Sequence, residues 1–549
     1  LTAWSLFQKN HTGLRVYGPL FYGRYIAESL RDKVTQYTER PGDGRPFSLI
    51  TRNWVYRSSK SLDLQHGVLH PTGTKSYEGF GTTADLHTSG KHLFQPAPVG
   101  YTREEVPDCA FRVDVGEDSA FILKYPVTRS GMSFGALGAV ATRALSDANG
   151  LLCDSAGSGG LDNTGEGGMS PHHCPVTPEG QEYLDRLNAR AHVLGHNYTF
   201  RFDKTATSDG KLLNVPLDLT ISKMVKGRVV RPSSFGAAQV GISERTRHTI
   251  FQIGASLSGV RVLPNEITGE QPLEIDWGWL NYICGLSWVR GVEIKLQQGA
   301  KPNDGGTVSA SKLTDELCAL RGIQKGADYH SPERFPYMPS PGNSKDKHYA
   351  DALTQVLIKV RDLPNFKRRI LLLGVKMTYT GDGFLEALGG HIKKGYGPDY
   401  IQIDGAEGGT GAADTTMTDR VGMDTYNGLS RAHLALTRCG ARDKVRLVAS
   451  GRLVDAGTVA AAMCLGADWV ATGRGVMLAM GCIQARECHS GKCPAGITTH
   501  NSWRQRGLDP ANKGVRVASY ITYMRSSVMR IARSVGVDFR GGRSFEAHH

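Results

Sequence analysis

Short apolar runs alternate with helical patterns along most of this chain, and that alternation restricts the fold more than any other sequence feature. Each run leads into glycine-rich or polar residues, and a segment with helical periodicity follows. The runs are Phe121–Leu123, Tyr125–Val127, Leu151–Cys153, Val292–Leu296, Ile370–Val375, Tyr400–Ile403, Val445–Val448 and Trp469–Ala471, and the helical patterns lie near 138–148, 350–361, 383–394, 429–439 and 455–465. Strands that alternate with helices build a parallel sheet. We therefore expect an α/β fold, a (β/α)8 TIM-type barrel with its active site beyond the carboxyl ends of the strands.

The chain has 549 residues, more than a single barrel requires, so we expect additional segments. Residues 1–105 show no catalytic arrangement and are predicted to form an N-terminal extension, in which Arg52–Lys60 forms a docked strand. Residues 106–515 are assigned to the barrel. Residues 160–290 fit no minimal barrel unit, which predicts an insertion over the barrel mouth, and 516–549 are predicted to form a C-terminal helical tail.

Three of the ten cysteines lie in one short, turn-rich loop with the spacing C-x5-C-x4-C: Cys482, Cys488 and Cys493. Thiolates gathered from a few turns suit a soft metal centre, and iron–sulfur loops use a Cys-Pro step such as Cys493-Pro494. The alternative is a set of buried cysteines in an ordinary loop. The other seven cysteines stand singly, which argues against a disulfide framework and favours a reducing compartment.

Glycines and arginines follow consecutive predicted strands. Ser450-Gly451-Arg452 and Thr472-Gly473-Arg474 each end a strand, and the glycine-rich stretch 405–413 follows the strand before them. Glycine lets backbone N–H groups approach a ring or phosphate closely, and arginine pairs with phosphate. This pattern predicts a flavin-type phosphate site. No G-x-G-x-x-G motif opens a helix after a strand, so a Rossmann nucleotide site is not expected.

Four polar side chains lie within or just after strands predicted to be buried: Lys295, Gln298, Lys301 and Lys376. Buried lysine is rare unless it is paired or functional, so salt-bridged or snorkelling lysines are the alternative to a site. Glu166 lies in a glycine-rich loop and is either a capping carboxylate or a proton-transfer group. Arg321 follows a helical pattern that by itself places it on the surface.

Several function classes find little support. The net charge of +13 permits anionic substrates, acidic partners or membrane surfaces, but lysines and arginines are dispersed, so no nucleic-acid binding is expected. His172-His173 near Cys174 lacks a second ligand pair for zinc, and no Ser/His/Asp arrangement stands out. No apolar run reaches the ~18 residues of a membrane helix. The chain begins at Leu1, so a leader or anchor upstream of it remains an expectation.

With these motifs in view, the chain resembles the FMN-binding synthase domain of the glutamate synthase family, and most closely its stand-alone members. The similar segments, in family order, are Met132–Ala136, Asn163–Gly168, Lys295–Pro302, Asp404–Ala413 and Gly481–Ala485 continuing to Pro494. The resemblance implies a barrel that holds FMN beside a [3Fe-4S] cluster ligated by Cys482, Cys488 and Cys493. In the family, electrons pass through the cluster to FMN, and 2-oxoglutarate and ammonia are converted to glutamate.

The resemblance also implies roles for individual residues. Those matching catalytic or substrate-side positions are Glu166, Lys295, Lys301 and Arg321. Those matching the FMN site are Met132, Ser133, Gly135, Ala136, Gln298, Lys376, Gly408, Gly409, Thr410, Gly411, Gly451, Arg452, Gly473 and Arg474. Cationic groups suit both the substrate carboxylates and a flavin that gains negative charge on reduction.

Departures from the family keep alternatives open. The glutaminase and electron-donor domains are absent from this sequence, so the expected partners are an external donor (ferredoxin or an NAD(P)H-linked subunit) and free ammonia, a glutaminase subunit or a larger complex. Phe335 stands for a family histidine and Thr307 for a glutamine. The alternatives are amine transfer on another substrate, as in N-methylglutamate synthases, and a structural or assembly subunit. Cytoplasm and mitochondrial matrix both fit, as does membrane association through a partner or an upstream segment.

Overall fold

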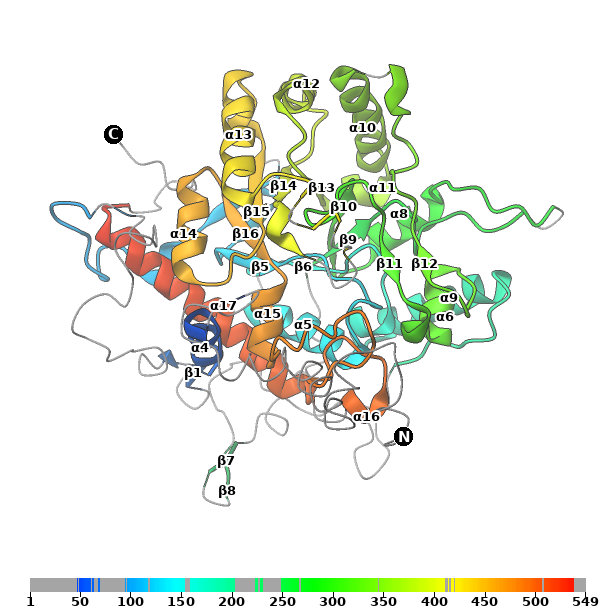
Figure 1. The fold of residues 1–549 in the computed structure, drawn as a ribbon, viewed down its shortest axis with the longest axis horizontal. Coiled ribbons are helices and arrows are strands. Elements are labelled where there is room, and N and C mark those ends of the chain that lie inside the picture. Colours follow the sequence, from blue (N-terminus) through cyan, green and yellow to red (C-terminus); the bar gives the residue numbers. More distant parts are fainter. Residues whose placement is uncertain are drawn as a thin grey trace, which may run out of the picture.

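Eight parallel strands form a nearly closed barrel, which confirms the predicted (β/α)8 class (Figure 1). The computed structural model describes residues 47, 49–60, 62–63, 68–69, 94, 96–116, 119–153, 158–202, 223–225, 228–230, 248–265, 268–343, 345–409, 413, 416–418, 420–505 and 508–537. The barrel strands are β5 (Val127–Arg129), β6 (Asp162–Asn163), β9 (Thr249–Ile253), β10 (Val289–Lys295), β13 (Leu372–Met377), β14 (Tyr400–Asp404), β15 (Arg446–Ser450) and β16 (Trp469–Thr472). Their order is β5-β16-β15-β14-β13-β10-β9-β6, so the first and last strands along the chain are neighbours.

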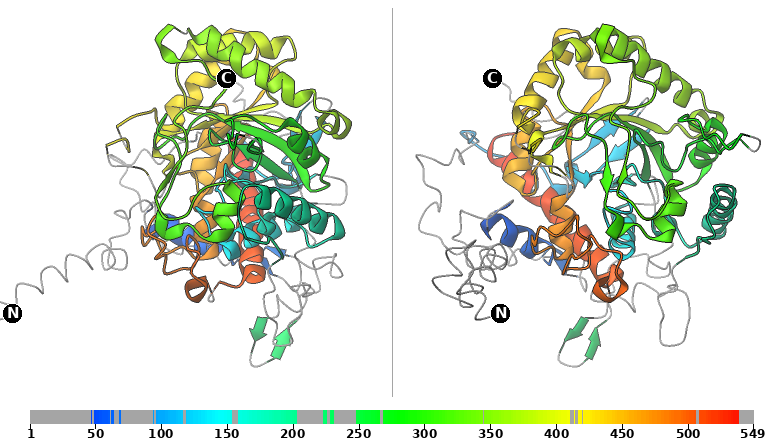
Figure 2. Two further views of the ribbon diagram at one scale, coloured as in Figure 1. Left: turned by 90° about the vertical axis from the view of Figure 1, so that its right-hand side faces the viewer. Right: turned by 45° about the vertical axis from the view of Figure 1, so that its right-hand side comes forward.

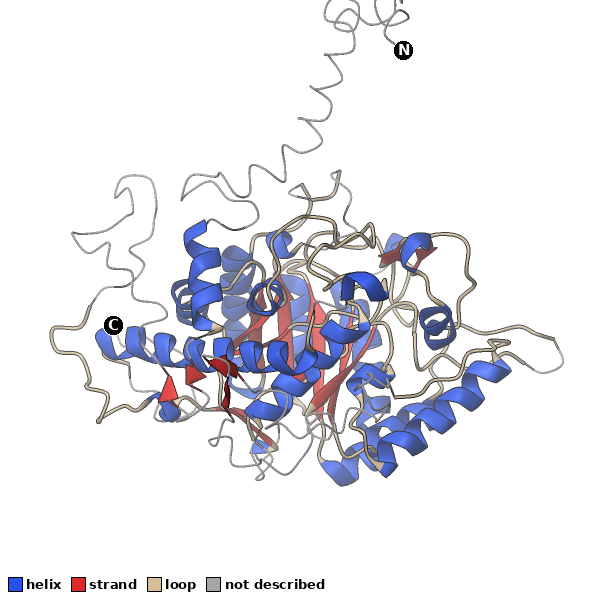
Figure 3. Cartoon of the chain, turned by 90° about the horizontal axis from the view of Figure 1, so that it is seen from below, coloured by secondary structure: helices blue, strands red, loops and turns tan. Residues whose placement is uncertain are grey.

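The helices surround this ring, as the right-hand view of Figure 2 shows for α10, α12 and α13. The helices outside the N-terminal segment are α5 (Ala139–Leu152), α6 (Pro178–Val193), α8 (Trp277–Gly285), α9 (Asp315–Arg321), α10 (Asp346–Arg361), α11 (Pro364–Arg369), α12 (Asp382–Lys393), α13 (Thr425–Arg438), α14 (Ala456–Cys464), α15 (Arg474–Met480), α16 (Ser502–Gln505) and α17 (Pro510–Ser534). The long helix α17 runs beside the strands and packs against α5, α14 and α15 (Figure 3). None of the helices in the described ranges is long and apolar enough to cross a membrane.

Among the described residues, four two-stranded antiparallel sheets lie outside the barrel. They are β1 (Leu62–Asp63) with β2 (Val68–Leu69), β3 (Val113–Val115) with β4 (Phe121–Leu123), β7 (Lys223–Val225) with β8 (Arg228–Val230), and β11 (Thr307–Val308) with β12 (Tyr329–His330). Of these, β4 continues into the barrel strand β5 after a short connection.

Local sequence explains where several helices begin. Asp276, Thr314, Asp424 and Asp455 each stand at a helix N-cap, where a side-chain oxygen accepts a hydrogen bond from a backbone N–H of the first turn. Such a cap satisfies one of the N–H groups that a helix start leaves without an internal partner. These caps therefore mark the starts of α8, α9, α13 and α14.

Three sequence predictions were wrong in detail. Leu151–Leu152 end helix α5 instead of forming a strand, and Phe121–Leu123 form a strand outside the barrel. Arg52 to Ser58 belong to helix α4 (Leu49–Ser58), not to a strand. An apolar run of three residues fits a strand or a buried helix end equally well, because periodicity needs a longer window. The range 160–290 contains two barrel strands, β6 and β9, which the sequence reading did not predict.

Between β5 and β6, side chains take the place of backbone pairing among the described strands. Arg129 at the end of β5 donates to Asp162 of β6 with an Nη1–Oδ1 distance of 2.8 Å, and both side chains are almost completely buried. Arg129 also donates to the Met132 carbonyl, and Ser146 of α5 donates to the second Asp162 oxygen. This ion pair therefore bridges the seam of the barrel.

Breaking the seam pair should destabilise the protein strongly. We expect Arg129→Met to lower the free energy of unfolding by about 3–5 kcal/mol, because Asp162 would remain buried without its cation. Denaturant unfolding followed by tryptophan fluorescence measures this. The control is Lys367→Met, which removes an exposed ion pair with Asp362 of nearly the same length, 2.9 Å, and should cost less than about 1 kcal/mol. Equal effects of the two substitutions would contradict the role of the seam.

Candidate functional site

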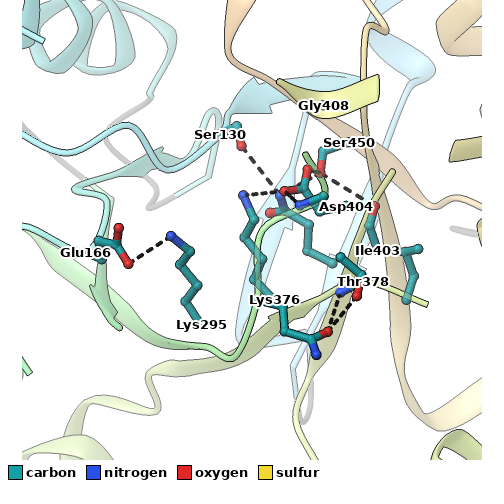
Figure 4. Close-up of polar contacts among 12 residues, drawn as sticks. Ser130, Glu166, Lys295, Lys376, Thr378, Ile403, Asp404, Gly408 and Ser450 are labelled. Atoms are coloured by element: carbon teal, nitrogen blue, oxygen red, sulfur yellow. Dashed lines mark hydrogen bonds and ion pairs between the residues drawn. The ribbon is translucent and has the colours of Figure 1, made fainter. Parts of the chain in front are cut away.

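Two buried ion pairs lie at the carboxyl ends of neighbouring barrel strands (Figure 4). Lys295 ends β10, and its Nζ lies 2.8 Å from Oε2 of Glu166 in the loop after β6. Lys376 of β13 pairs with Asp404, the last residue of β14, at 3.2 Å. Lys295 and Lys376 are also direct partners in the parallel register of β10 and β13. The fold therefore places two ammonium groups side by side, each held by one carboxylate.

The Glu166–Lys295 pair has opposing influences on its two groups. Burial alone would raise the pKa of Glu166, but Lys295, Arg321 and Lys376 together hold it below its ordinary value. Burial lowers the pKa of Lys295, and the neighbouring Lys376 adds to that effect, while Glu166 opposes it. A carboxylate and an ammonium in such a balance can exchange or hold a proton near a reacting atom.

Asp404 is fixed from several directions. Its Oδ2 accepts from the Gly299 backbone N–H at 2.9 Å, and its Oδ1 accepts from the Ser450 hydroxyl at 2.5 Å. Burial would raise the pKa of Asp404, but Lys376 and these hydrogen bonds hold it below the ordinary value. Ser450 in turn accepts from Gln402, which links β14 and β15. The carboxylate of Asp404 is therefore an anchor that orients the ammonium of Lys376.

The barrel interior below these pairs is also polar. Glu293 of β10 accepts from Asn163, Gln252 and Tyr400, which come from three different strands. Tyr400 reaches Glu293 over Gly374, where an added Cβ would lie 2.1 Å from the tyrosine ring. Burial raises the pKa of Tyr400 well above its usual range, so it stays a neutral donor to the carboxylate. Glu293 lies two residues before Lys295 on β10, so this network fixes the strand directly beneath Lys295.

Arg321 faces the Glu166 side of the site from helix α9. Its Nη2 donates to the Ser133 hydroxyl and the Phe134 carbonyl in the loop after β5. Gly135 and Gly167 allow this approach, because an added Cβ at either would lie within about 3 Å of the guanidinium. Burial lowers the pKa of Arg321, and Glu166 counteracts it. The surface position read from the helical pattern was therefore wrong: Arg321 is half-buried beside Glu166.

Lys301 and Gln298 lie in the loop after β10. The ammonium of Lys301 is buried and contacts the Thr307 hydroxyl at 3.2 Å and Asp304 at 3.5 Å. No described contact joins it to Glu166. The side-chain oxygen of Gln298 is buried without a hydrogen-bond partner among the described residues. An unsatisfied buried amide oxygen favours a bound group that can donate to it.

Two arginines gather at the ends of β15 and β16. Burial and the nearby Arg452 lower the pKa of Arg474 to about 10, so the two guanidinium groups are close enough to repel each other. Arg474 donates to the carbonyls of Glu407 and Gly408. An added Cβ at Gly409 would lie 3.2 Å from the same guanidinium. Neighbouring cations on a glycine-lined edge are typical of an anion site.

Three further residues predicted for the cofactor site have described contacts. Met132 approaches Gly473, where an added Cβ would lie 3.3 Å from its sulfur. Gly451 packs its backbone against Thr425 at the start of α13. The carbonyl of Ala136 accepts from Lys312 at 3.0 Å. Thr410 and Gly411 lie outside the described residues.

The cysteine loop is held by a segment between β11 and α9. Ser309, Ser311 and Lys312 donate to three consecutive carbonyls of the loop, with distances of 3.1 Å to His489, 3.5 Å to Ser490 and 3.2 Å to Cys488. Lys312 is buried, and burial lowers its pKa to about 8. Because its other bond goes to Ala136, Lys312 ties the cysteine loop to the loop after β5.

The N-terminal segment holds the other side of the same loop. The Tyr56 hydroxyl of α4 donates to the Cys482 carbonyl at 2.6 Å. Phe47 and Gln484 exchange two hydrogen bonds of 3.1 Å, one in each direction. The Phe47 ring also lies under the guanidinium of Arg474, 5.3 Å from its centroid. Through Phe47 and Tyr56, the N-terminal segment therefore contacts the cysteine loop, and through Phe47 it also contacts Arg474.

The polar side chains at the strand ends suit FMN more completely than the three cysteines, as they are placed, suit an iron–sulfur cluster. The unsatisfied Gln298 oxygen, the paired lysines and the two arginines together suit a polar ring system with a phosphate. The three thiols of the loop influence one another electrostatically, and burial raises the pKa of Cys482 to about 12. Within the described part of the chain, no three His, Cys, Asp or Glu side chains are placed to hold a metal ion.

Several residues of the site were missed by the sequence reading. Glu293 and Asp404 were not singled out, although each stands two residues from another polar position on its strand: Lys295 and Gln402. That two-residue spacing places both side chains on the inner face of the barrel and was the available signal. Lys312 lies outside any strand and follows only from three-dimensional contacts.

Residues 108–538 match the family described as the conserved region in glutamate synthase. The glutamate synthase large subunit-like protein YerD of Bacillus subtilis is 32% identical over 290 residues, covering 53% of this chain and 51% of YerD. A glutamate synthase large subunit-like protein of Rhizobium meliloti is 31% identical over 261 residues, covering 45% of this chain and 55% of the relative. The archaeal glutamate synthase (NADPH) of Methanocaldococcus jannaschii is 30% identical over 256 residues, with 46% and 47% covered.

The matched region of this chain thus spans about half the length of these curated relatives. Among solved structures, the flavin-binding domain of baker's yeast flavocytochrome b2 is similar over 95% of this chain and 84% of its own, at 10% identity. Its TM-score of 0.37 is too low to bear on fold or function.

The Glu166–Lys295 pair predicts a specific pH dependence of stability. The pKa of Glu166 in the folded protein is below the ordinary 4.5, so its ionised form stabilises the fold above pH 4.5. That contribution is lost as the pH falls through the folded-state pKa. Thermal unfolding should show Glu166→Gln less stable than the unmodified protein at neutral pH, with the gap closing below 4.5. A gap that is constant or grows in acid would contradict the ion pair.

Lys312 is predicted to immobilise the cysteine loop. We expect Lys312→Met to speed amide hydrogen exchange at residues 484–492 by about tenfold or more, because two charge-assisted hydrogen bonds are lost. Mass spectrometry of peptic fragments measures this in the purified protein. Lys492→Met is the control, since Lys492 is an exposed lysine of the same loop and should leave exchange unchanged. The same rise in both variants would show that Lys312 has no special role.

Proposed function

Since this chain belongs to the glutamate synthase family, we propose that it is an FMN- and iron–sulfur-dependent oxidoreductase that converts 2-oxoglutarate and ammonia to glutamate. The observation that carries this proposal is the buried Glu166–Lys295 pair, with Arg321 and Lys376 close enough to affect the same carboxylate. The overall reaction joins 2-oxoglutarate and ammonia with two electrons and two protons, and it releases glutamate and water. The substrate is a dianion, which suits an edge rich in cations.

Glu166 would manage the proton balance of this reaction. Forming the imine from ammonia and a ketone requires protons to leave nitrogen and to reach the departing oxygen. The Glu166 carboxylate, kept ionised by its neighbours, is able to accept such a proton and return it. Lys295 would orient Glu166 through the 2.8 Å contact. Arg321 would hold a carboxylate of the substrate while Ser133 and Phe134 fix its guanidinium.

FMN would be held by the edge from β13 to β16. The residues proposed for the ring are Lys376, Gln298 and the loop from Met132 to Ala136. The residues proposed for the phosphate are Gly408, Gly409, Gly451, Arg452, Gly473 and Arg474, together with Thr410 and Gly411. When bound, FMN supplies two-electron chemistry and a [3Fe-4S] cluster supplies one-electron transfer. Lys376, anchored by Asp404, would place positive charge where electron density increases on reduction.

The cluster ligands we propose are Cys482, Cys488 and Cys493. They lie on one loop, and each pair of thiols is close enough for electrostatic interaction. Thiolates are the usual ligands of such clusters. Lys312 would contribute by fixing the Cys488 carbonyl, and Tyr56 by fixing that of Cys482. Lys301, tied to Thr307 and Asp304, would act on the substrate side of the loop after β10.

Other proteins would complete the reaction. We propose an external electron donor, either a ferredoxin or an NAD(P)H-linked subunit, to supply the two electrons of the reaction. Ammonia would come free or from a glutaminase subunit. The compartment proposed is the cytoplasm or the mitochondrial matrix, with membrane association only through a partner or an upstream segment.

A second candidate function is amine transfer onto a different 2-oxo acid or amine. Two differences from the family pattern favour it. Phe335, which stands for a family histidine, is 1% exposed and packs against Tyr337. Thr307, which stands for a glutamine, contacts Lys301 instead of leaving that ammonium to a ligand. Thr307 directly follows Gly306, where an added Cβ would lie 2.6 Å from a carboxylate oxygen of Glu166.

The reaction can be tested in a single turnover. The purified protein is reduced anaerobically and mixed with 2-oxoglutarate and ammonium, and the return of oxidised-flavin absorption and the glutamate formed are measured. We expect one glutamate per two electrons, and a rate about a hundredfold lower in Glu166→Gln, whose amide cannot accept the proton. Pyruvate lacks the second carboxylate and serves as the control. Reoxidation by another oxo acid, or with methylamine in place of ammonium, but not by 2-oxoglutarate and ammonium would favour the second candidate, and no reoxidation by any of these would rule out both.

A further inference from the structure

A cysteine and a histidine form a close pair outside the candidate site, at the opposite end of the barrel. Cys153 directly follows helix α5, and His248 directly precedes strand β9. Cys153 Sγ lies 3.0 Å from His248 Nδ1. Both residues are half-buried. Because His248 precedes its strand, the pair lies at the amino-terminal end of the barrel, away from Glu166 and Lys295.

The surrounding structure fixes the histidine. His248 has a left-handed backbone with φ of 53°, a conformation that non-glycine residues rarely adopt. Its carbonyl accepts from the Asp162 backbone N–H at 3.1 Å, and its ring meets the edge of Phe121 with centroids 5.1 Å apart. An unusual backbone conformation that is held by tertiary contacts directs the imidazole to one position, toward the thiol.

The chain around Cys153 is equally constrained. The thiol is also 3.5 Å from the Gly160 carbonyl. Gly159 lets the returning chain pass close to the end of α5, because an added Cβ would lie 2.4 Å from the Leu152 carbonyl oxygen and 2.6 Å from the Cys153 Cα. Two backbone hydrogen bonds join Gly159 to Ile122 of strand β4 and to Lys124, which follows that strand. The sulfur therefore has few alternative positions relative to the ring nitrogen.

The charged groups on the elements packed around the pair have partners of their own. Asp162 turns its carboxylate to Arg129 and Ser146 across the barrel seam. Arg290 of β10 lies over the Phe121 ring and donates to the carbonyls of Ala120 and Arg369. Lys124 follows β4; its backbone N–H donates to Gly159, and Lys124 has a further partner as well. His248 is thus the titratable group in direct contact with the Cys153 sulfur among the contacts described.

We propose that Cys153 is a reactive thiol activated by His248, and that it exchanges with low-molecular-weight disulfides. His248 Nδ1 takes the proton from Sγ, and the resulting thiolate attacks one sulfur of the reagent. A new bond forms between Cys153 and that sulfur as the reagent's own S–S bond breaks. The other half leaves as a thiolate and takes up a proton. Cys153 is oxidised, the leaving sulfur is reduced, and the disulfide is the oxidant.

The test is site-resolved alkylation of the intact protein with iodoacetamide, read by peptide mass spectrometry across a pH series. Cys439 is the internal reference, because it is also half-buried but donates to the Leu436 carbonyl at 3.4 Å instead of facing an imidazole. We expect Cys153 to react about tenfold faster than Cys439 near neutral pH, with a midpoint below the ordinary thiol value of about 8.5. Equal rates and equal midpoints would overturn the proposal.

The variant that isolates the histidine is His248→Asn. Asparagine tolerates the left-handed backbone, so the fold is expected to persist, and near-ultraviolet circular dichroism checks it. Cys153 alkylation should slow about tenfold near neutral pH, and Cys439 should be unchanged. Incubation with glutathione disulfide should produce a mixed disulfide at Cys153 in the unmodified protein and much less in the variant. Unchanged Cys153 reactivity in His248→Asn, or no mixed disulfide in the unmodified protein, would refute the assignment.

Should the asparagine variant fail to fold, Cys153→Ser provides an independent measurement. In the unmodified protein, the imidazole shares its proton with the thiol, so its titration by nuclear magnetic resonance should show a second transition that belongs to Cys153. That transition should disappear in Cys153→Ser. A His248 titration identical in the two proteins would overturn the proposal.

Discussion

The closure of the barrel across one seam is the constraint on which the rest of the structure depends. Seven neighbouring strand pairs share backbone hydrogen bonds, and the eighth junction is bridged by Arg129 and Asp162. Closure there brings the loop after β5 against the loop after β6, so closely that an added Cβ at Gly165 would lie 2.3 Å from the Ser133 nitrogen. Glu166 follows Gly165, so the seam decides where the key carboxylate lies. An ion pair at the base of these loops therefore helps to position Glu166.

Buried charge is the second organising feature. Isolated charges are costly in a barrel interior, and here each lysine at the strand ends has one carboxylate, while Glu293 beneath them has three donors. The lysines and carboxylates come from different elements, so the site exists only when the barrel is assembled. The cysteine loop is then attached to this edge from two sides, by Ser309 to Lys312 and by Phe47 and Tyr56. The strand ends that carry Lys295, Lys376 and Arg474 and the cysteine loop thus form one continuous assembly.

The sequence predicted the barrel and the helices α10, α12, α13 and α14 well, because each carries a long periodic pattern. It missed β6, which has two residues, and β9, which lies after a stretch without a clear pattern. Lys295 and Lys376 were found because lysine stands out in an apolar strand. Their partners were harder to predict: the carboxylate that pairs with a lysine depends on register and closure, which no local pattern encodes. Arg321 was also misjudged from local pattern: the sequence of α9 is typical of a surface helix, and only the tertiary structure places Arg321 beside Glu166.

Anaerobic absorption and electron paramagnetic resonance spectroscopy of the purified protein, before and after reduction, test the central claim that one edge of the barrel carries flavin and cluster together. The account predicts bound flavin and a three-iron signal in the oxidised protein. It also predicts that Cys488→Ser loses the signal and keeps the flavin, whereas Cys439→Ser keeps both. A protein purified with neither cofactor, and unable to bind them on reconstitution, would contradict the account and leave the barrel as a structural subunit.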